Sequence, residues 1–421
     1  GIRDGAGGNG NGNYTVTLAT NTASSITRLN SVTWTGGGST TDWFDPANWA
    51  GGAVPDLSNV ANVVIGNSAN ATFGSANTVN IDSLNGGGLT QNAGTLNVGT
   101  GGMSLGSFSQ SGGTAAVQGN VTVNGNFEQN STGTLTVVGN ANLTDTSGGL
   151  VIGNLSAAAL SATSTGGDIT QTASTTIAVT GATTVDAGNS NISLNSATND
   201  FGGTVTARGT NITLVDAGAL VAALTATGNS TLTAGTTLGV SGSTQGLTTS
   251  AGGATTLGST TVGGNLSLTS AGVVTQSGPL TVSGTTLISA AGQSVTLDNA
   301  GNDFTGAVTV TGATTALRDS NALTAALATT GDTTVQAGGD LVVSGTVSGL
   351  GSDLTTTTTG TGSTQFGTTT VGGKLAATSA GAVTQSGALT VTDTTTLTAT
   401  GQAVTLDNAG NDFTGAVTVT G

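Results

Sequence analysis

The chain repeats itself over a long interval, and this repetition limits what it can fold into. Residues 293–312 read QSVTLDNAGNDFTGAVTVTG, and residues 402–421 read QAVTLDNAGNDFTGAVTVTG, with a single difference. A more diverged copy, NDFGGTVTARG at 199–209, matches NDFTGAVTVTG at 302–312. Repeats of this kind consist of smaller units that each bury their apolar face against a neighbour.

A shorter rhythm runs inside each long repeat. Runs such as LSL at 266–268, LTV at 280–282 and VTL at 295–297 alternate apolar and polar residues, and Gly, Asn, Asp or Ser separates them. This alternation indicates strands, and helix is disfavoured because Thr, Val and Gly are poor helix formers. Short strands joined by tight turns can lie parallel only if the chain coils. The prediction is an all-β, right-handed parallel β-helix (β-solenoid), with about 20–22 residues per rung, forming an elongated rod.

The composition excludes most kinds of active site. The sequence has no His and no Cys, only 6% charged residues and 3% aromatic residues. Imidazole bases, thiolate nucleophiles and His or Cys metal sites are therefore impossible. We expect no enzyme activity, no catalytic residues, no cofactor and no metal site.

The charge pattern excludes nucleic acid as a partner. The net charge is −15, and only five basic residues are present. They are scattered singly along the chain: Arg3, Arg28, Arg208, Arg318 and Lys374. Polyanion binding needs clustered basic residues. No apolar run approaches the about 20 residues of a membrane span, so no membrane span is expected either.

The sequence predicts two regions. Residues 1–100 form a β-rich segment with a tryptophan-containing excursion at 33–55, continuous with the solenoid. Residues 101–421 form the β-helix, with long repeats at about 150–255, 256–364 and 365–421. The last copy is shorter than the others, so we expect the chain to be part of a longer array.

The tryptophan segment carries a family resemblance. It reads TWTGGGSTTDWFDPANWAGGAVP from Thr33 to Pro55 and holds all three tryptophans. This pattern, together with NDFTGAVTVTG and LRDSNALT, resembles large bacterial exoproteins of the filamentous haemagglutinin-like and autotransporter adhesin kind. The resemblance implies secretion, an outer-membrane β-barrel transporter as partner, as in two-partner secretion, and display as a fibre on the cell surface. The family's amino-terminal N-P-N secretion motif is absent from this sequence.

Two groups of residues are candidates for binding. Trp34, Trp43, Phe44 and Trp49 could stack on sugar rings, or they could form the apolar core of the excursion. The turn containing Asp298, Asn299, Asn302 and Asp303 returns as Asp407, Asn408, Asn411 and Asp412. Its oxygens could bind Ca²⁺, but Asp and Asn are also common turn formers, and the turn-forming interpretation is preferred.

Pairs of threonines separated by one residue are a further candidate for a surface function. Thr134/Thr136, Thr231/Thr233 and Thr309/Thr311 are spaced like the threonines of ice-binding solenoids. From the sequence they do not recur at one fixed position of every rung, so this role is not expected.

Three hypotheses for function follow. The first is a segment of a secreted, extracellular fibrous adhesin that attaches to cells, a host surface or a biofilm matrix. The second is an exopolysaccharide-binding matrix module that uses the tryptophan cluster. The third is a polysaccharide-degrading enzyme on the same fold, which needs two carboxyls about 5 to 10 Å apart.

Overall fold

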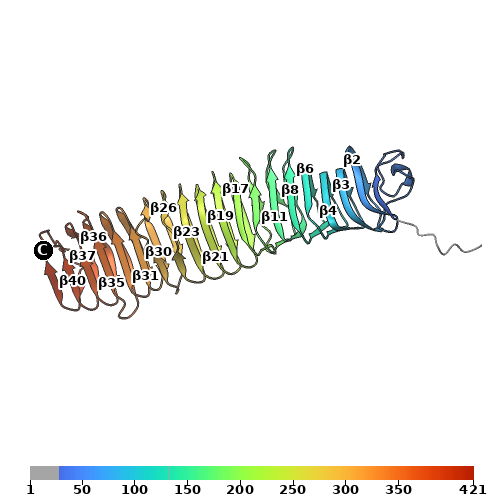
Figure 1. Cartoon of the computed structure of the whole chain (residues 1–421). Coiled ribbons are helices and arrows are strands. Elements are labelled where there is room, and N and C mark those ends of the chain that lie inside the picture. The colour runs from blue at the N-terminus through green and yellow to red at the C-terminus, as the bar shows by residue number, and fades with distance from the viewer. Residues whose placement is uncertain (1–27, 131) are drawn as a thin grey trace, which may run out of the picture.

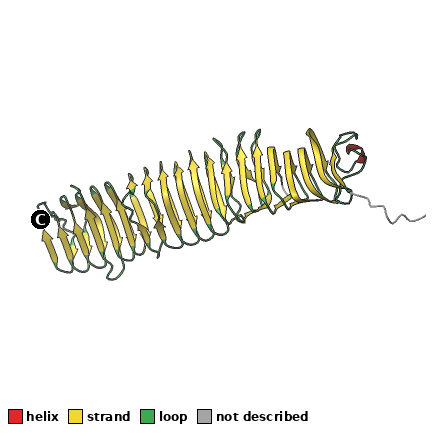
Figure 2. Cartoon of the chain, viewed as in Figure 1, coloured by secondary structure: helices red, strands yellow, loops and turns green. Residues whose placement is uncertain are grey.

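The structure of the protein is a computed structural model that describes residues 28–130 and 132–421. The predicted N-terminal segment begins at residue 1, so its part at 1–27, with Arg3, lies outside the described residues. About 59% of the chain is strand, arranged in about 19 stacked turns. The turns form a single elongated rod (Figure 1), and Figure 2 shows almost no helix. The prediction of an all-β solenoid is confirmed.

The rod begins with four strands that stack in sequence order. The last three are long and bend around the corners of the rod. Their bounds are β1 Leu29–Thr33, β2 Val60–Phe73, β3 Thr78–Gln91 and β4 Thr95–Gln110. One 3₁₀ turn, η1 Pro46–Asn48, lies between β1 and β2.

Beyond β4 the strands stack in parallel ladders, which we call the first, second and third sheets. The long strand β6 Val121–Gln129 feeds both the first and the second sheet. The first sheet continues through β8 Asn140–Asp145, β11 Ala159–Ser164, β14 Thr183–Asp186, β17 Thr204–Gly209, β19 Leu220–Ala226, β21 Leu238–Thr244, β23 Thr255–Val262, β25 Val274–Gln276, β28 Val295–Leu297, β31 Thr315–Asp319, β33 Thr333–Ala337, β35 Leu354–Thr358, β37 Leu375–Thr378, β40 Thr395–Thr398 and β42 Val417–Thr420.

The second sheet runs along the other broad side of the core. It consists of β9 Leu150–Ile152, β12 Ile169–Gln171, β15 Ile192–Leu194, β18 Ile212–Asp216, β20 Asn229–Ala234, β22 Gly246–Ala251, β24 Leu266–Ser270, β27 Thr286–Ser289, β30 Val308–Gly312, β32 Leu323–Thr329, β34 Leu341–Val347, β36 Thr364–Val371 and β38 Val383–Gln385.

The third sheet is a set of three short ladders that do not pair with one another. The strands of the middle ladder follow first-sheet strands along the chain, whereas those of the other two follow second-sheet segments, so the middle ladder lies at the opposite edge of the rod. Its members are β5 Thr114–Val117, β7 Thr134–Val137, β10 Asn154–Ala157, β13 Ile177–Val179 and β16 Asp200–Phe201, then β26 Leu280–Val282 and β29 Asp303–Phe304, then β39 Leu389–Val391 and β41 Asp412–Phe413. Where it is missing, a turn of the rod consists of two facing strands.

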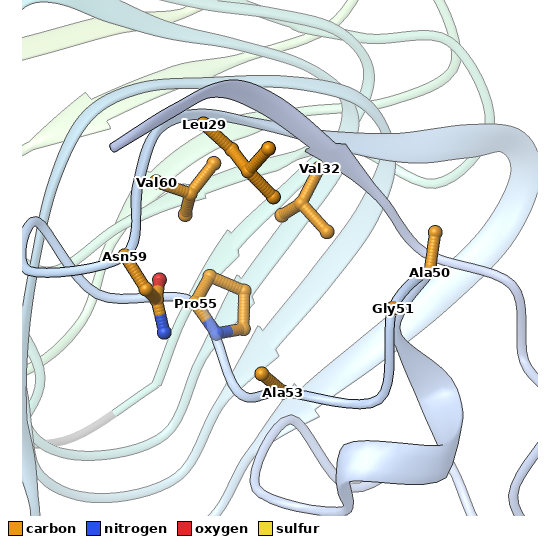
Figure 3. A pocket seen from close by; sticks show the side chains of 8 residues that line it. All are labelled: Leu29, Val32, Ala50, Gly51, Ala53, Pro55, Asn59 and Val60. Atoms are coloured by element: carbon orange, nitrogen blue, oxygen red, sulfur yellow. The ribbon is translucent and has the colours of Figure 1, made fainter. Parts of the chain in front are cut away.

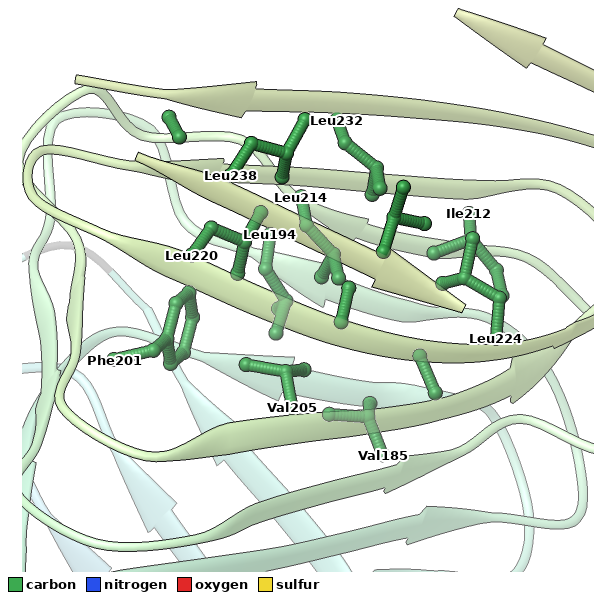
Figure 4. Close-up of a cluster of buried hydrophobic side chains, with 14 of the residues drawn as sticks. Val185, Leu194, Phe201, Val205, Ile212, Leu214, Leu220, Leu224, Leu232 and Leu238 are labelled. Carbon is green, nitrogen blue, oxygen red and sulfur yellow. The ribbon is translucent and has the colours of Figure 1, made fainter. Parts of the chain in front are cut away.

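Alternation of side chains explains why these residues form strands. In β19, Leu220, Ala222 and Leu224 are buried, and the residues between them face outward. The same alternation recurs along the rod, and Figure 4 shows the aliphatic side chains meeting between the sheets. The narrow interior suits small and medium apolar residues, and a fully buried Val, Leu or Ile side chain contributes about 1.5 to 3 kcal/mol.

The turns vary in length more than the predicted uniform rung allows. Thr286 pairs with Val308 one turn later, and this turn includes β29 of the third sheet. Val308 pairs with Ala325, a distinctly shorter interval, in a turn that has no third-sheet strand. The extra strand is not the only cause of a long turn, because Leu341 pairs with Thr364 in a turn that has loops in place of a third-sheet strand.

Successive long repeats place the same strand on opposite sides of the rod. Thr309 and Thr418 occupy the same position of the repeated segment. Thr309 lies in β30, which stacks on β27 in the second sheet, whereas Thr418 lies in β42, which stacks on β40 in the first sheet. An odd number of main segments per repeat produces this alternation, because consecutive main segments lie in opposite sheets. Between β40 and β42 the second-sheet position is held by Val404, which bridges Val383 of β38.

The threonine pairs fall into different sheets. Thr134 and Thr136 lie in β7 of the third sheet, whereas Thr231 and Thr309 lie in one row of the second sheet. Between them this row passes through Thr248, Ser267 and Leu287, so threonine does not occupy one fixed position of every turn, as the sequence predicted.

Candidate functional site

The tryptophan segment, residues 33–55, loops out between β1 and β2 at the N-terminal end of the rod (Figure 1). Its rings pack edge to face. The ring centroids of Trp34 and Trp49 are 4.9 Å apart, and those of Trp43 and Trp49 are 4.8 Å apart. Trp43 also contacts Phe73 of β2, at 5.7 Å between centroids. The cluster therefore joins the loop to the first turns of the core.

The burial of these rings favours the core interpretation. Trp43 is 0% exposed, Trp49 2% and Trp34 7%. Phe44 is partly buried, and its ring centroid lies 5.0 Å from that of Phe73. Stacking on a sugar requires a ring face that is open to solvent, and the three indoles present none.

The polar residues of the same motif shape the loop. Asp45 caps η1 by accepting a hydrogen bond from the Ala47 N–H at 2.9 Å. Asn48 is fully buried and donates to the carbonyls of Thr40 and Asp42, at 3.0 and 2.9 Å. Trp49 Nε1 donates to the carbonyl of Trp43 at 2.7 Å. The motif that carries the family resemblance is thus a structural motif.

Replacing Trp49 by phenylalanine tests this role. The ring contacts are largely kept, but the carbonyl of Trp43 loses its buried donor, which costs about 1 to 3 kcal/mol. Hydrogen exchange of residues 33–55 is expected to accelerate accordingly. Phe44→Leu, at a partly buried position, is the control and is expected to change exchange less.

A small apolar pocket lies beside this loop (Figure 3). Its volume is about 60 Å³. The residues that line it are Leu29, Val32, Ala50, Gly51, Ala53, Pro55, Asn59 and Val60. Pockets that bind small molecules usually measure about 300 to 1,000 Å³, so this one is too small for a sugar ring with its partners.

The predicted oxygen-rich turn is split between surface and interior. Asp298 is exposed, but Asn302 is 0% exposed and points into the rod. Its Oδ1 accepts from Gln276 Nε2 at 2.8 Å, and its Nδ2 donates to Gln276 Oε1 at 3.0 Å. Asn302 Oδ1 also accepts from the N–H of Leu280 at 3.0 Å. The asparagine is therefore engaged by the preceding turn, which supports the turn-forming interpretation.

The same pair of amides recurs in each long repeat. Gln171 and Asn199 exchange hydrogen bonds of 2.7 and 2.9 Å, and Gln385 and Asn411 exchange bonds of 2.8 and 2.9 Å. In every copy the asparagine also accepts from the first N–H of the third-sheet strand one turn earlier. We call these three pairs the Gln–Asn clamps.

A second set of buried amides was missed from the sequence. Gln91, Gln110 and Gln129 are at most 1% exposed and stack inside consecutive turns. Gln110 donates to Gln91 Oε1 at 3.1 Å, and Gln129 donates to Gln110 Oε1 at 2.8 Å. Their regular spacing of 19 residues was the available signal. Glutamine is usually a surface residue, which hid its role.

Two buried carboxylates, each on the turn that follows a clamp, accept hydrogen bonds from the backbone of the last third-sheet strand before them. Asp216 and Asp319 are both 2% exposed. Asp216 accepts from the N–H of Phe201 at 2.9 Å, and Asp319 accepts from the N–H of Phe304 at 2.9 Å. Burial raises the pKa of both carboxyls above the ordinary value of 3.8, although these backbone hydrogen bonds act in the opposite direction. The next turn has no third-sheet strand, so each carboxylate supplies the hydrogen-bond acceptor that a backbone carbonyl of such a strand would otherwise provide.

The raised pKa values predict a pH dependence of stability. Above pH 3.8 these two carboxyls ionise in the unfolded chain, whereas in the folded chain they still hold their protons. The folded state therefore loses stability as pH rises from the ordinary pKa to the raised pKa of the folded chain. An Asp216→Asn/Asp319→Asn variant lacks this cost. Relative to the variant, the parent is expected to lose stability as pH rises above the ordinary carboxyl pKa of 3.8, which thermal unfolding across that range measures. A difference that stays constant with pH contradicts the assignment.

Few other charged groups interact. Among the described residues, Arg208 and Asp186 form the only ion pair, at 3.0 Å, and their side chains are 54% and 38% exposed. No group of three or more His, Cys, Asp or Glu in the described part of the chain is placed to hold a metal ion. Across residues 28–130 and 132–421, no helix has the length and apolarity needed to cross a membrane.

The clamps coincide with a known repeat family. Residues 138–208, 244–311 and 351–420 each match the model of a family described as repeats of unknown function, DUF5649. The chain thus carries three stretches similar to DUF5649 repeats. Each stretch holds one Gln–Asn clamp and overlaps one of the three predicted copies. No curated protein and no solved structure matches the chain.

Proposed function

We propose that this β-helical repeat scaffold is a stalk segment of a secreted bacterial surface adhesin, which holds a binding region away from the cell. The observation that carries the proposal is the unbroken parallel stacking from β1 to β42. About 19 turns at about 4.8 Å give a rod of about 90 Å. In such a rod each turn contacts only its neighbours, so more repeats add length without a new fold.

The hydrogen bonding of the buried polar groups also supports a structural role. The buried amides of the clamps, the stacked glutamines and the carboxylates of Asp216 and Asp319 all bond to the rod itself. Buried polar groups that are fully satisfied rigidify a core and specify one register. These side chains hold the rod together and leave few groups free for chemistry.

Secretion and surface location belong to the same proposal. The motif of residues 33–55 resembles bacterial exoproteins, and the chain has no cysteine that would crosslink in an oxidising periplasm. Export through an outer-membrane transporter, and attachment to cells, a host surface or a biofilm matrix, are the expectations that follow from this resemblance.

The polysaccharide-binding alternative has less support. In the described residues, the aromatic side chains that keep appreciable exposure are Phe44 and Phe413. Sugar recognition by stacking needs larger open ring surfaces. For the enzyme alternative, the three buried carboxylates of the described residues, Asp145, Asp216 and Asp319, accept backbone hydrogen bonds on different turns. We propose that the protein is not an enzyme.

An adhesion assay tests the proposal. Beads coated with the full chain would be washed over bacterial cells, host cells and a biofilm matrix, beside beads that carry the urea-unfolded chain. Retention of the folded chain alone is expected on at least one surface. Equal retention of both preparations on every surface contradicts an adhesive role, and release of sugar from a purified polysaccharide would overturn the non-enzyme assignment.

A further inference from the structure

An uncharged row of side chains follows the outer face of the second sheet. Paired strands place one outward residue from each of eleven consecutive turns in line: Val151, Thr170, Ser193, Thr213, Thr231, Thr248, Ser267, Leu287, Thr309, Ala326 and Ser344. Leu287, near the middle of the row, is 47% exposed. We call the outward side of β9 to β34 in this sheet the neutral face.

The neutral face carries no charged side chain, although the chain has a net charge of −15. Its other outward residues are mainly Thr, Ser, Val, Ala and Asn, and none is charged. The row ends at Glu128, which pairs with Val151. The first sheet carries the Asp186–Arg208 ion pair and exposed Arg318 on its own outer side. Two copies of this chain can therefore approach closely over the neutral face without placing like charges opposite each other.

The size of the face fits a specific interface. Eleven turns at about 4.8 Å span about 50 Å, and strands of three to seven residues at about 3.3 Å add about 16 Å of width. The product is on the order of 800 Å², which is about the area each partner buries in a standard protein interface. Interface centres are depleted in charged residues, as this face is.

We propose that the neutral face docks a second copy of this chain, so that two rods pair side by side through their second sheets. A second copy fits because its outward rows have the same spacing along the rod, and hydroxyl and methyl groups can meet in register over many turns. A neutral polysaccharide is the less favoured occupant, because the face has no aromatic residue for sugar rings. The pairing does not depend on the adhesive role proposed above.

Sedimentation of the full chain over a range of protein and salt concentrations tests the pairing. Dimers are expected to form reversibly in the range of about 10 to 100 µM. Association is expected to strengthen with salt, because salt screens the repulsion between two chains of charge −15. A chain that stays monomeric at all concentrations, or that dissociates as salt rises, overturns the proposal.

Matched lysine variants locate the interface. Thr231→Lys/Thr248→Lys/Thr309→Lys places three charges on the neutral face, and Thr206→Lys/Thr225→Lys/Thr256→Lys places three on the outer side of the first sheet. Both sets change net charge equally, and all six positions are exposed. At least a tenfold weaker dimer is expected for the first set only. Equal effects of the two sets contradict the location.

Two further measurements separate the remaining outcomes. Circular dichroism checks that both variants keep β structure; if the first set fails to fold, the single change Leu287→Thr is expected to weaken the dimer instead. Retention on immobilised neutral glucan, lost only with the neutral-face lysines while the chain remains monomeric, would assign the face to polysaccharide and overturn the proposal of a second copy.

Discussion

Asn302→Ala is expected to lower the free energy of unfolding of its repeat by about 3 to 5 kcal/mol. The asparagine is 0% exposed, and its removal leaves the Leu280 N–H without this partner and takes two hydrogen bonds from the Gln276 amide, which keeps its bonds to Gly278 and Asn299. An orphaned buried N–H costs about 1 to 3 kcal/mol, and the two lost amide bonds and a cavity add to this. Hydrogen exchange is the suitable measurement, because long repeat arrays do not unfold in one cooperative step.

The control lies four residues away in the same turn. Asp298 is exposed, so Asp298→Ala should change stability by less than about 0.5 kcal/mol. Accelerated exchange in β25 to β29 for the Asn302 variant alone supports the clamp. If both variants exchange alike, the buried pair has no special role. Asn199→Ala should repeat the effect one repeat earlier, since it makes the same contacts with Gln171.

Gly345→Ala is expected to be comparably severe, at about 3 kcal/mol or more. Gly345 has φ +107°, and a Cβ there would overlap the carbonyl oxygen of Leu327 in the neighbouring turn. Backbone cannot move aside without breaking the β32 to β34 ladder, so steric overlap adds to the strain of a positive φ. Gly242 has the same φ and the same close contact in the preceding repeat.

Gly351 separates overlap from backbone strain. It also has positive φ, +75°, but nothing lies within 4 Å of the position that an added methyl group would take. Gly351→Ala should therefore cost only about 1 to 2 kcal/mol of strain. The comparison uses thermal unfolding and local hydrogen exchange of β32 to β36. Similar losses for the two variants would show that close packing between turns is not what requires Gly345.

The solenoid was predictable because its signal is local. Leu266, Leu268, Leu280 and Val282 stand in alternating runs, and all four are buried. Alternation, turn residues and the long repeat all favour the same answer, and such agreement between levels is typical of a foldable sequence.

The turn lengths and the alternation of faces were not predictable in the same way. The strand of Leu280 and Val282 lies in the third sheet, whereas the similar run of Leu266 and Leu268 lies in the second. Nothing in the short alternating runs distinguishes a strand of the first or second sheet from a strand of the third sheet. The side chains that bond to the third-sheet strands stand later in the sequence: Asn302 accepts from the Leu280 N–H and Asp319 from the Phe304 N–H.

The candidate site was anticipated only in part. The core interpretation of Trp34, Trp43 and Trp49 was one of two alternatives, and burial favours it. The buried glutamines were not anticipated, because a polar residue inside a rod is recognisable only by its partner one turn away. The sequence spacing of 19 residues between Gln91 and Gln110 becomes meaningful once the register is known.

Distances along one row of the second sheet test the stacked rod most directly. The chain has no cysteine, so introduced pairs carry spin labels at defined sites. Thr309→Cys paired with Thr231→Cys spans four turns, and paired with Thr170→Cys it spans seven turns. At about 4.8 Å per turn, the expected separations are about 19 Å and about 34 Å. Separations that do not grow in proportion to the number of turns would contradict the solenoid.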